Sequence, residues 1–569
     1  MRKHTVRRSR AVRRSSSFLA VVLSVAVVAG LLAVAASASP ASDEADAQKN
    51  KALVLSGPMT TLKAKLQGKT DVDFGPNCDT TTGRVKIPTV YAPPCVQQFT
   101  GKNGGSTSQG VTGDAVKVVV YTGDPAKDPL LAGQLRAVGA SLDVSAIQDT
   151  WRGYIDIYNQ LFQLYGRKIE PEFYVGTGPG SDTTAAKADA IAIGDKKPFA
   201  VLGGPAQSTT VFADELAHRG VSCLGTCALA MPTTITDRNE PYIITDTLSP
   251  EQAAQLTAEF IGKQLGKGKA EFAGDDATKK KNRVYGILHY NTPDGQYTGL
   301  FKNLTDGLKK YKITAKADQS FFLDLSRAQE TARTVITKLK DAGVTTVIYT
   351  GDPVMPGAFT KEATAQNWHP EWVVGPTVLA DTAVFARSYD QDQWAHAFGV
   401  QLTPGRVPQE LNAANTLYQW FHGSAPPNNT YQVIAPSVSQ LARGVMLAGP
   451  KLTPQALRDG LFRYPPSGGD PINPTQSWGK HGFWPGTDWY GTDDAGMLWW
   501  DPSAVGQDEI GQVAPGLYRL ASGGKRYTRG KFPAKGQGGL FDTASSVTIF
   551  QQLPPEDAQP NYPPPAAGG

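Results

Sequence analysis

Short apolar runs alternate with segments of helical periodicity along most of the chain, and this alternation is the feature that most limits the possible folds. Residues 118–121 and 199–202 are apolar runs suited to buried strands. Between them, apolar side chains spaced by three and four residues over 151–165 predict one helix that ends at Gly166. Strands that alternate with helices of roughly 10–20 residues are typical of parallel βαβ units covered on both faces.

The alternation occurs twice in series, and a chain of 569 residues is too long for one ordinary domain. The first block is predicted to hold strands at 118–121, 173–175, 199–202 and 221–224 and helices at 151–165, 185–193 and 208–218. The second block is predicted to hold strands at 284–290, 321–325, 344–349 and 372–374 and helices at 250–265, 297–310, 328–341 and 358–366. Further helices are predicted at 411–421, 431–447 and 454–462. The predicted fold class is therefore α/β, with two doubly wound lobes built on parallel sheets.

The N-terminus has the features of an export signal. Seven basic residues and no acidic residue occur in the first 38 positions, the run 18–36 is apolar, and Ala36-Ser37-Ala38 offers a cleavage site. We expect a signal peptide at 1–38, with 45–47 as a second cleavage candidate, and an extracytoplasmic protein that is secreted or held at the cell surface. The apolar run is long enough to remain as an uncleaved anchor, and this alternative stays open. No cysteine lies near the cleavage region, which excludes a lipid-anchored N-terminal cysteine.

The four cysteines are expected to form disulfides, because an exported chain enters an oxidising compartment. Three connectivities are possible. The local pairs Cys78–Cys95 and Cys223–Cys227 are favoured, because each pair lies in one loop neighbourhood. The seven histidines are scattered and give no pair at metal-ligand spacing, so no metal site is predicted.

Charge and absent motifs exclude several function classes. Without the first 38 residues the chain keeps 49 basic and 51 acidic residues, so no nucleic-acid-binding face is expected. The sequence contains no P-loop and no nucleophile elbow. The loop Gly176–Ser181 ends in serine where a dinucleotide-binding loop needs glycine, and its Pro179 lacks an amide donor. No enzymatic activity, catalytic residue or cofactor is therefore predicted.

One loop has the composition of a ligand site. In open α/β sheets, ligands bind at the carboxyl ends of the strands. The loop 203–210 follows the strand 199–202 and brings glycines, hydroxyl groups and free amides to a predicted helix start. Such an arrangement suits a carboxylate. An ordinary helix cap by Ser208 explains the same residues without a ligand, and the sequence leaves both explanations open.

Four segments, taken in order, resemble type I periplasmic binding proteins, and within them the branched-chain-amino-acid-binding group of ABC transporter receptors. Gly110–Val118 is similar to the entry to the first strand, and Tyr165–Ile169 to the turn after the first helix. Phe199–Pro205 is similar to the third strand and ligand loop, and Leu339–Val347 to a helix and strand of the second lobe. The resemblance covers roughly residues 110–462.

This resemblance implies two lobes joined by three crossover strands, with the ligand between them. It implies lobe 1 at 111–247 and 397–450 and lobe 2 at 248–396 and 451–550. Residues 39–110 are expected to be an extension outside the core. The Pro-rich tail at 551–569 is expected to be disordered.

The resemblance also implies a ligand site at the strand ends. The implied residues are Ala206, Gln207, Ser208, Thr226 and Ala228 in lobe 1, and Tyr290, Asp352 and Thr377 in lobe 2. The three consecutive lobe 1 residues would hold the charged end of the ligand. Asp352 is the one acid placed to pair with a ligand ammonium group, and a role as a strand-end turn residue explains it equally well.

The implied function is that of an extracytoplasmic solute-binding protein. It would deliver a small polar ligand, an amino acid or a related compound, to an ABC importer by closure of the cleft. The expected partners are the small molecule and an ABC permease, with membrane contact only through the N-terminal segment if that segment is uncleaved. The alternative is a ligand-sensing or surface-binding protein of the same fold that works without a transporter.

Five of the ten tryptophans lie within 478–500, in a glycine-rich stretch with the composition of a loop. We expect these rings to pack onto lobe 2, because a loop with large rings usually buries them against a domain. A wall of the ligand cleft and an exposed glycan-binding face are the alternatives.

Overall fold

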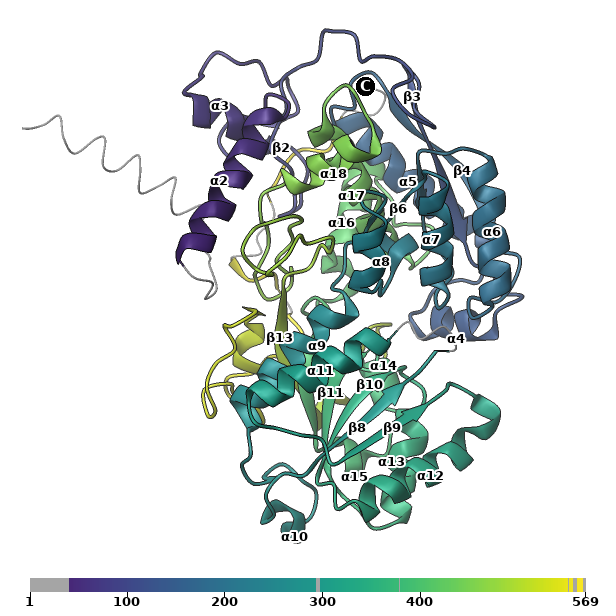
Figure 1. Cartoon of the computed structure of the whole chain (residues 1–569), viewed down its shortest axis with the longest axis vertical. Coiled ribbons are helices and arrows are strands. Elements are labelled where there is room, and N and C mark those ends of the chain that lie inside the picture. The colour runs from purple at the N-terminus through teal and green to yellow at the C-terminus, as the bar shows by residue number, and fades with distance from the viewer. Residues whose placement is uncertain (1–39, 293–296, 378, 551, 556–559, 566–569) are drawn as a thin grey trace, which may run out of the picture.

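The computed structural model describes residues 40–292, 297–377, 379–550, 552–555 and 560–565. They form two α/β lobes arranged along the long axis of the molecule, with an N-terminal extension beside the upper lobe (Figure 1). The expected signal peptide at 1–38 lies outside the described residues. Within those residues, no helix combines the length and the hydrophobicity needed to cross a bilayer.

Lobe 1 is built on a five-stranded parallel sheet of order β4-β3-β5-β6-β7. Its strands are β3 (Ala115–Thr122), β4 (Lys168–Val175), β5 (Ala200–Leu202), β6 (Ser222–Leu224) and β7 (Ile243–Ile244). In the register of this sheet, Val118 of β3 pairs with Pro171 of β4 and with Ala200 of β5. Every residue of β3 except Lys117 is buried, because helices cover both faces of the sheet.

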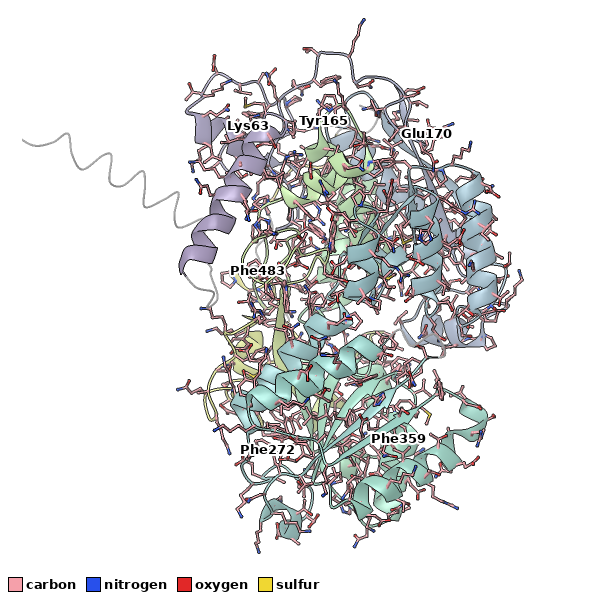
Figure 2. The ribbon with its side chains drawn as sticks, viewed as in Figure 1. Lys63, Tyr165, Glu170, Phe272, Phe359 and Phe483 are labelled. Carbon is pink, nitrogen blue, oxygen red and sulfur yellow. A yellow bond between two sulfur atoms is a disulfide. The ribbon has the colours of Figure 1, made fainter. Side chains whose placement is uncertain are left out.

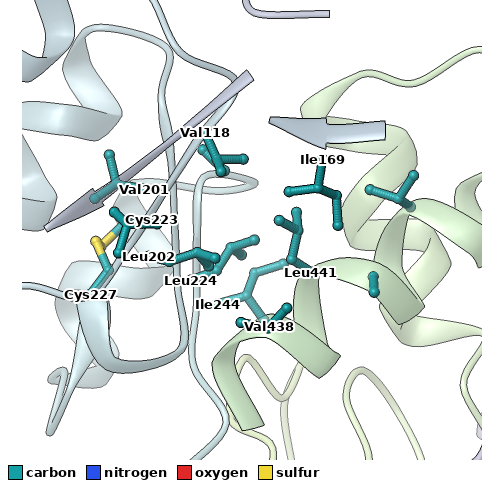
Figure 3. Packing of buried hydrophobic residues seen from close by; sticks show 14 of the residues in the cluster. Val118, Ile169, Val201, Leu202, Cys223, Leu224, Cys227, Ile244, Val438 and Leu441 are labelled. Carbon is teal, nitrogen blue, oxygen red and sulfur yellow. A yellow bond between two sulfur atoms is a disulfide. The ribbon is translucent and has the colours of Figure 1, made fainter. Parts of the chain in front are cut away.

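The helices of lobe 1 come from two distant parts of the chain. The first part supplies α4 (Pro129–Ala137), α5 (Val144–Leu161), α6 (Thr183–Asp195), α7 (Thr209–His218), the 3₁₀ turn η1 (Gly225–Ala228) and α8 (Thr233–Arg238). The second part supplies α16 (Ala413–His422), α17 (Tyr431–Ala448) and α18 (Pro454–Phe462). Val438 and Leu441 of α17 pack toward Leu224 and Ile244 of the sheet in one buried cluster (Figure 3).

Lobe 2 is built on a larger sheet, whose main path has the order β14-β13-β12-β11-β10-β8-β9. Its parallel strands are β8 (Tyr285–Tyr290), β9 (Ala317–Phe321), β10 (Thr346–Gly351), β11 (Glu371–Thr377) and β12 (Ala397–Gln401). Antiparallel strands extend it: β13 (Asp494–Gln507), β14 (Val513–Leu520) and β15 (Tyr527–Thr528). The predicted strand at 321–325 is wrong, because the edge strand β9 ends at Phe321 and leaves Phe322 and Leu325 exposed.

The helices of lobe 2 lie on both faces of this sheet. They are α9 (Pro250–Phe260), the π-helical η2 (Ile261–Leu265), α10 (Asp276–Lys279), α11 (Thr298–Lys310), α12 (Ala328–Asp341), α13 (Pro356–Ala365), α14 (Ala383–Ala386) and α15 (Gln391–Trp394). Three-residue 3₁₀ turns lie at Leu325–Arg327 and Gln409–Leu411, and a further 3₁₀ segment lies at Ala521–Gly524. α9 begins with a capping box, in which Ser249 and Gln252 satisfy each other's backbone amides. At the amino-terminal ends of β8 and β11, the side chains of Arg283 and Glu371 form a fully buried ion pair at 2.8 Å.

The chain passes between the lobes three times, at 245–249, 402–412 and 463–493. The expected domain limits differ from this arrangement at two points. β12, expected in lobe 1, pairs with β11 of lobe 2 through Trp372–Ala397. α18, expected in lobe 2, packs on α17 in lobe 1, where Gly444 faces Leu457. The reason is that strand pairing and helix packing, and not the chain order implied by the resemblance, decide which lobe holds these two elements.

The extension is a folded part of lobe 1 and not a segment outside its core. It contains the helices α2 (Pro40–Ser56) and α3 (Thr61–Gln67) and the two-residue strands β1 (Cys78–Asp79) and β2 (Arg84–Val85). Ile87 and Val96 are buried in the hydrophobic cluster of lobe 1. The Arg463 guanidinium, just after α18, donates to the Leu53 carbonyl of α2 at 3.0 Å. Both favoured disulfides, Cys78–Cys95 in the extension and Cys223–Cys227 in lobe 1, are confirmed.

The Pro-rich tail is anchored in its described part, which corrects the expectation of disorder there. The Tyr562 hydroxyl donates to an oxygen of Asp79 in the extension at 2.9 Å. The Trp420 indole of α16 donates to the Tyr562 carbonyl at 2.9 Å. One aromatic side chain and its backbone carbonyl thus hold this end of the chain against lobe 1.

The tryptophan-rich stretch forms a bridging hairpin, residues 475–493, in which Gly479 and Asp488 exchange backbone hydrogen bonds. Trp478 and Trp489 are buried in the core of lobe 1, whereas Phe483 and Trp484 are buried in a core of lobe 2. Figure 2 shows Phe483 at the junction between the lobes. The expected burial is therefore confirmed, but the hairpin packs into both lobes rather than onto lobe 2 alone.

Candidate ligand-binding site

The eight expected site residues all lie at the carboxyl ends of parallel strands. In lobe 1, Ala206, Gln207 and Ser208 follow β5, and Thr226 and Ala228 lie in η1 after β6; in lobe 2, Tyr290 ends β8, Asp352 follows β10 and Thr377 ends β11. The carboxyl ends of the two sheets point toward the boundary between the lobes (Figure 1). Topology therefore places both sets of residues at this boundary, one set on each lobe.

The start of α7 is the part of lobe 1 best suited to an anion. Ser208 is only 2% exposed and precedes the first turn, yet its hydroxyl makes no capping hydrogen bond. Its backbone amide donates to the Gly180 carbonyl at 2.9 Å, which fixes the loop. Ala206 is exposed and Gln207 is half-buried, so the loop in front of the helix is accessible. The sequence alternative of a Ser208 cap is therefore wrong, and the positive end of the helix dipole has no capping side chain from this residue.

The loop after β6 in lobe 1, which contains the expected site residues Thr226 and Ala228, is held by a disulfide and by α17. Cys223–Cys227 closes η1, and a Cβ at Gly225 would lie 2.3 Å from the Ser437 hydroxyl oxygen. The Thr226 amide donates to that same oxygen at 3.1 Å. The Ala228 side chain is fully buried in the core, so Ala228 can offer a ligand only its backbone. Ser437 was missed by sequence analysis because it lies about two hundred residues away in the chain.

In lobe 2, the expected site residue Asp352 has one carboxylate oxygen that makes no hydrogen bond with the described residues. Asp352 Oδ1 accepts hydrogen bonds from the amides of Val354 at 2.7 Å and Met355 at 2.9 Å, as a strand-end turn residue does. Asp352 Oδ2 is buried and has no hydrogen-bond partner within the described residues. Burial raises the pKa of this carboxyl, because the charged form loses hydration. The same strand end carries a second buried acceptor without a partner in the described chain, Thr350 Oγ1.

Aromatic rings surround the end of β8. The half-buried Tyr290 ring lies 5.8 Å from Tyr297 and 6.0 Å from Phe321, measured between ring centroids. The backbone of Thr377 pairs with Gly351, and a Cβ at Gly351 would lie 3.0 Å from the Tyr290 Cβ. The backbones at Tyr290, Asp352 and Thr377 therefore lie close together.

In the glycine-rich loop 176–181, the Gly180 amide is bound by a carboxylate of the protein itself. Asp128 Oδ2 accepts the Gly180 amide at 2.8 Å, and its Oδ1 caps α4 through the amides of Leu130 and Leu131. The loop is therefore held as a structural turn by hydrogen bonds within the protein. α4 itself lies at the boundary between the lobes (Figure 1).

The comparisons with known proteins bear on the fold. No family model matches the sequence, and no curated protein matches it. Similar solved structures include a type I periplasmic binding protein of Bordetella pertussis, with a TM-score of 0.47 and 14% identity, covering 71% of this chain and 100% of that one. A solute binding protein of an ABC transporter from R. palustris, in complex with 4-hydroxybenzoate, has a TM-score of 0.48 and 13% identity, covering 73% and 98%. A branched-chain amino acid transporter substrate binding protein of Streptococcus pneumoniae, in complex with isoleucine, has a TM-score of 0.45 and 14% identity, covering 72% and 100%.

The similar structures are thus type I periplasmic binding proteins, and they include binding proteins for branched-chain amino acids. More than a quarter of this chain lies outside each of these three matches. All three TM-scores are below 0.5 and all three identities are below 25%, so the ligand bound by each of these proteins is a property of that protein alone.

Proposed function

We propose that the chain is an extracytoplasmic solute-binding protein that captures a small polar ligand between its lobes and delivers it to an ABC importer. The observation that carries this proposal is the start of α7, at the carboxyl end of β5, where the buried Ser208 makes no capping hydrogen bond with its hydroxyl. A carboxylate there would accept a hydrogen bond from the Ser208 hydroxyl and would be stabilised by the positive end of the helix dipole. On lobe 2, Asp352 Oδ2 is an acceptor for an ammonium, amide or hydroxyl group of the same ligand.

The proposal is tested by a thermal-shift screen of amino acids and small carboxylates, followed by calorimetry of the compounds that stabilise the protein. Binding to both lobes should also reduce the radius of gyration in small-angle scattering, because contacts from two faces favour a closed state. A compound that binds by calorimetry without any change in scattering would contradict the two-lobe clamp.

Ser208→Ala is the sharpest variant, because the hydroxyl contributes no capping bond to the fold. We expect unchanged thermal stability and a loss of roughly tenfold or more in affinity, the effect of one hydrogen bond to a charged group. Thr453→Ala is the matched control, because Thr453 does cap α18 through the Ala456 amide. It should lower stability by about 1 kcal/mol and leave affinity unchanged.

One observation favours the second candidate, a binding protein that works without a transporter. All four cysteines of the chain are used in two disulfides, so none is free to carry a lipid anchor. A protein that diffuses away from the cell would serve an importer poorly. Cell fractionation with an antibody to the folded lobes distinguishes a membrane-held protein from one released into the medium.

A further inference from the structure

The hairpin formed by β13 and β14 of lobe 2 touches lobe 1 with its tip, residues 508–512. The two strands pair as far as Gln507 and Val513, so the tip is the turn between them. A Cβ at Gly139, just after α4 of lobe 1, would lie 3.4 Å from Ile510 Cγ2 and 3.6 Å from Ile510 Cβ. A single methyl group would thus fill the space between these two residues. The lobes are in contact here, at a point outside the three passages of the chain between them.

Charged side chains of lobe 2 hold the tip in a fixed shape. Asp508 Oδ1 accepts hydrogen bonds from the amides of Ile510 at 3.0 Å and Gln512 at 2.9 Å. Arg387, just after α14, forms an ion pair with Asp508 at 2.7 Å and donates to four backbone carbonyls of the hairpin. Such a network of charge-assisted hydrogen bonds leaves the turn little freedom.

The next residue of the tip binds it to a helix of lobe 2. The two carboxylate oxygens of Glu509 accept the amides of Ala383 at 3.0 Å and Val384 at 2.9 Å, in the first turn of α14. A carboxylate in this position satisfies amides that have no partner within the helix. The tip therefore moves together with lobe 2, and it carries Ile510 with it.

The surface that Ile510 meets in lobe 1 is fixed as well. Gly139 has a left-handed backbone, with a φ of +65°, and its amide donates to the Arg136 carbonyl at 3.0 Å at the end of α4. The side-chain amide of Asn429, in the loop before α17, donates to the Gly139 carbonyl at 2.9 Å. Because Gly139 has no side chain, Ile510 packs directly on the backbone that ends α4.

The opposite end of α4 lies beside the expected ligand loop. Asp128, which caps α4, accepts the Gly180 amide at 2.8 Å, and the Gly180 carbonyl accepts the Ser208 amide at 2.9 Å. A Cβ at Gly180 would lie 3.1 Å from the Ala206 amide nitrogen. One helix at the boundary between the lobes (Figure 1) thus joins the contact with Ile510 to the loop that contains Ala206 and Ser208.

We propose that the tip of the β13–β14 hairpin is a latch between the lobes, in which Ile510 holds the end of α4 and so keeps this helix in place beside the ligand loop. Movement of lobe 2 away from lobe 1 breaks the contact, so the mobility of α4 depends on how the lobes are arranged. As far as a ligand is concerned, the inference rests on the proposed function. The latch itself requires no ligand.

The test uses the full chain without any ligand and follows amide hydrogen exchange by mass spectrometry. Ile510→Asp removes the apolar contact and brings a hydrated charge to the backbone of Gly139. We expect exchange at 129–141 to become severalfold faster than in the wild type, because a segment that loses a fixing contact opens more often. If Ile510 only shaped its own hairpin, exchange would change at 505–515 and in α14, and not at 129–141.

Val505→Asp is the matched control, because it makes the same substitution in the same hairpin at a side chain that is 68% exposed. It should leave exchange at 129–141 as in the wild type. Ile510→Ala is the second variant, for the case that Ile510→Asp does not fold, and it should accelerate exchange in the same segment. Unchanged exchange at 129–141 in the Ile510 variants that fold, or an equal acceleration in Val505→Asp, would overturn the proposal. Failure to find a ligand would count against the proposed function and not against this result.

Discussion

Carboxylates near the carboxyl ends of the strands accept different numbers of hydrogen bonds in the two lobes. In lobe 1, Asp189 accepts hydrogen bonds from Tyr121, Tyr174 and Thr177, and Asp128 accepts three backbone amides with its two oxygens. In lobe 2, Asp352 uses one oxygen for a turn and leaves the other buried without a partner in the described chain. The two carboxylates of lobe 1 are therefore fixed by hydrogen bonds within the protein. In lobe 2, Asp352 keeps one oxygen that could accept a hydrogen bond from a ligand.

The difference suggests an order of events in the proposed binding cycle. A ligand that meets a fixed surface loses little free energy to rearrangement, and the disulfide-held η1 gives lobe 1 such a surface. Lobe 2 would gain a partner for Asp352 only on closure. We therefore expect the ligand to dock on lobe 1 first.

The largest expected effects come from the tryptophans that fix the hairpin in each core. Trp489→Ala in lobe 1 and Trp484→Ala in lobe 2 should each lower the free energy of unfolding by ~3–5 kcal/mol, because each leaves a large cavity. Urea denaturation followed by far-UV circular dichroism measures the loss. If both variants unfold like the wild type and lose binding to cell-wall polysaccharide, the rings form a glycan-binding face instead.

The next comparison concerns one buried acid in each lobe, Glu371 of β11 and Asp189 of α6. Glu371→Gln in lobe 2 removes the carboxylate that pairs with the buried Arg283 at 2.8 Å and leaves, among the described residues, only Glu271 at 3.6 Å, so it should cost about 3 kcal/mol. Asp189→Asn in lobe 1 disturbs only hydrogen bonds to neutral donors and should cost about 1–2 kcal/mol. Equal losses of unfolding free energy in the two variants, measured by the same urea denaturation, would contradict the expected difference between the ion pair and the neutral hydrogen bonds.

The smallest expected changes in stability have opposite signs at the strand ends of the two lobes. Asp128→Asn places an amide group toward the Gly180 amide and should cost about 1–2 kcal/mol. Asp352→Asn keeps Oδ1 for the turn and removes a buried charge. Because burial raises the pKa of Asp352, its ionisation lowers stability as the pH rises, so the variant should be more stable than the wild type at about pH 8 and no more stable than it at about pH 4. The thermal midpoints of the wild type and of both variants are measured at both pH values. A midpoint of Asp352→Asn below that of the wild type at the higher pH would contradict this prediction.

Elements with a strong local signal were predictable from the sequence. The predicted helix 328–341 is α12 to the residue, and its buried stripe is Ala332, Val335, Ile336 and Leu339. The helix predicted at 454–462 is also found at its predicted limits. In both cases, proline or glycine and a clear apolar period mark the ends.

Elements fixed by distant partners were not predictable. β12 and β13 pair through Phe398 and Trp499, which are about a hundred residues apart, and no local sequence pattern indicates that these strands are neighbours. α5 ends at Leu161 rather than at Gly166, because Phe162 is already extended and Tyr165 has a left-handed backbone. At the site, the strand ends were predictable from topology. The contact of Ser437 with Thr226 and the free oxygen of Asp352 depend on packing that the sequence does not reveal.

The three passages between the lobes also constrain how the chain reaches its native state. The sheet of lobe 1 is complete within 115–244, but α17, which covers it, follows some two hundred residues later. The sheet of lobe 2 needs β14, which ends at Leu520. Pairing between such distant segments requires large loops to close, and this is slow. A chain with this topology should finish folding only after nearly all of it has been synthesised, with a late step that joins Tyr562 to Asp79, 483 residues apart.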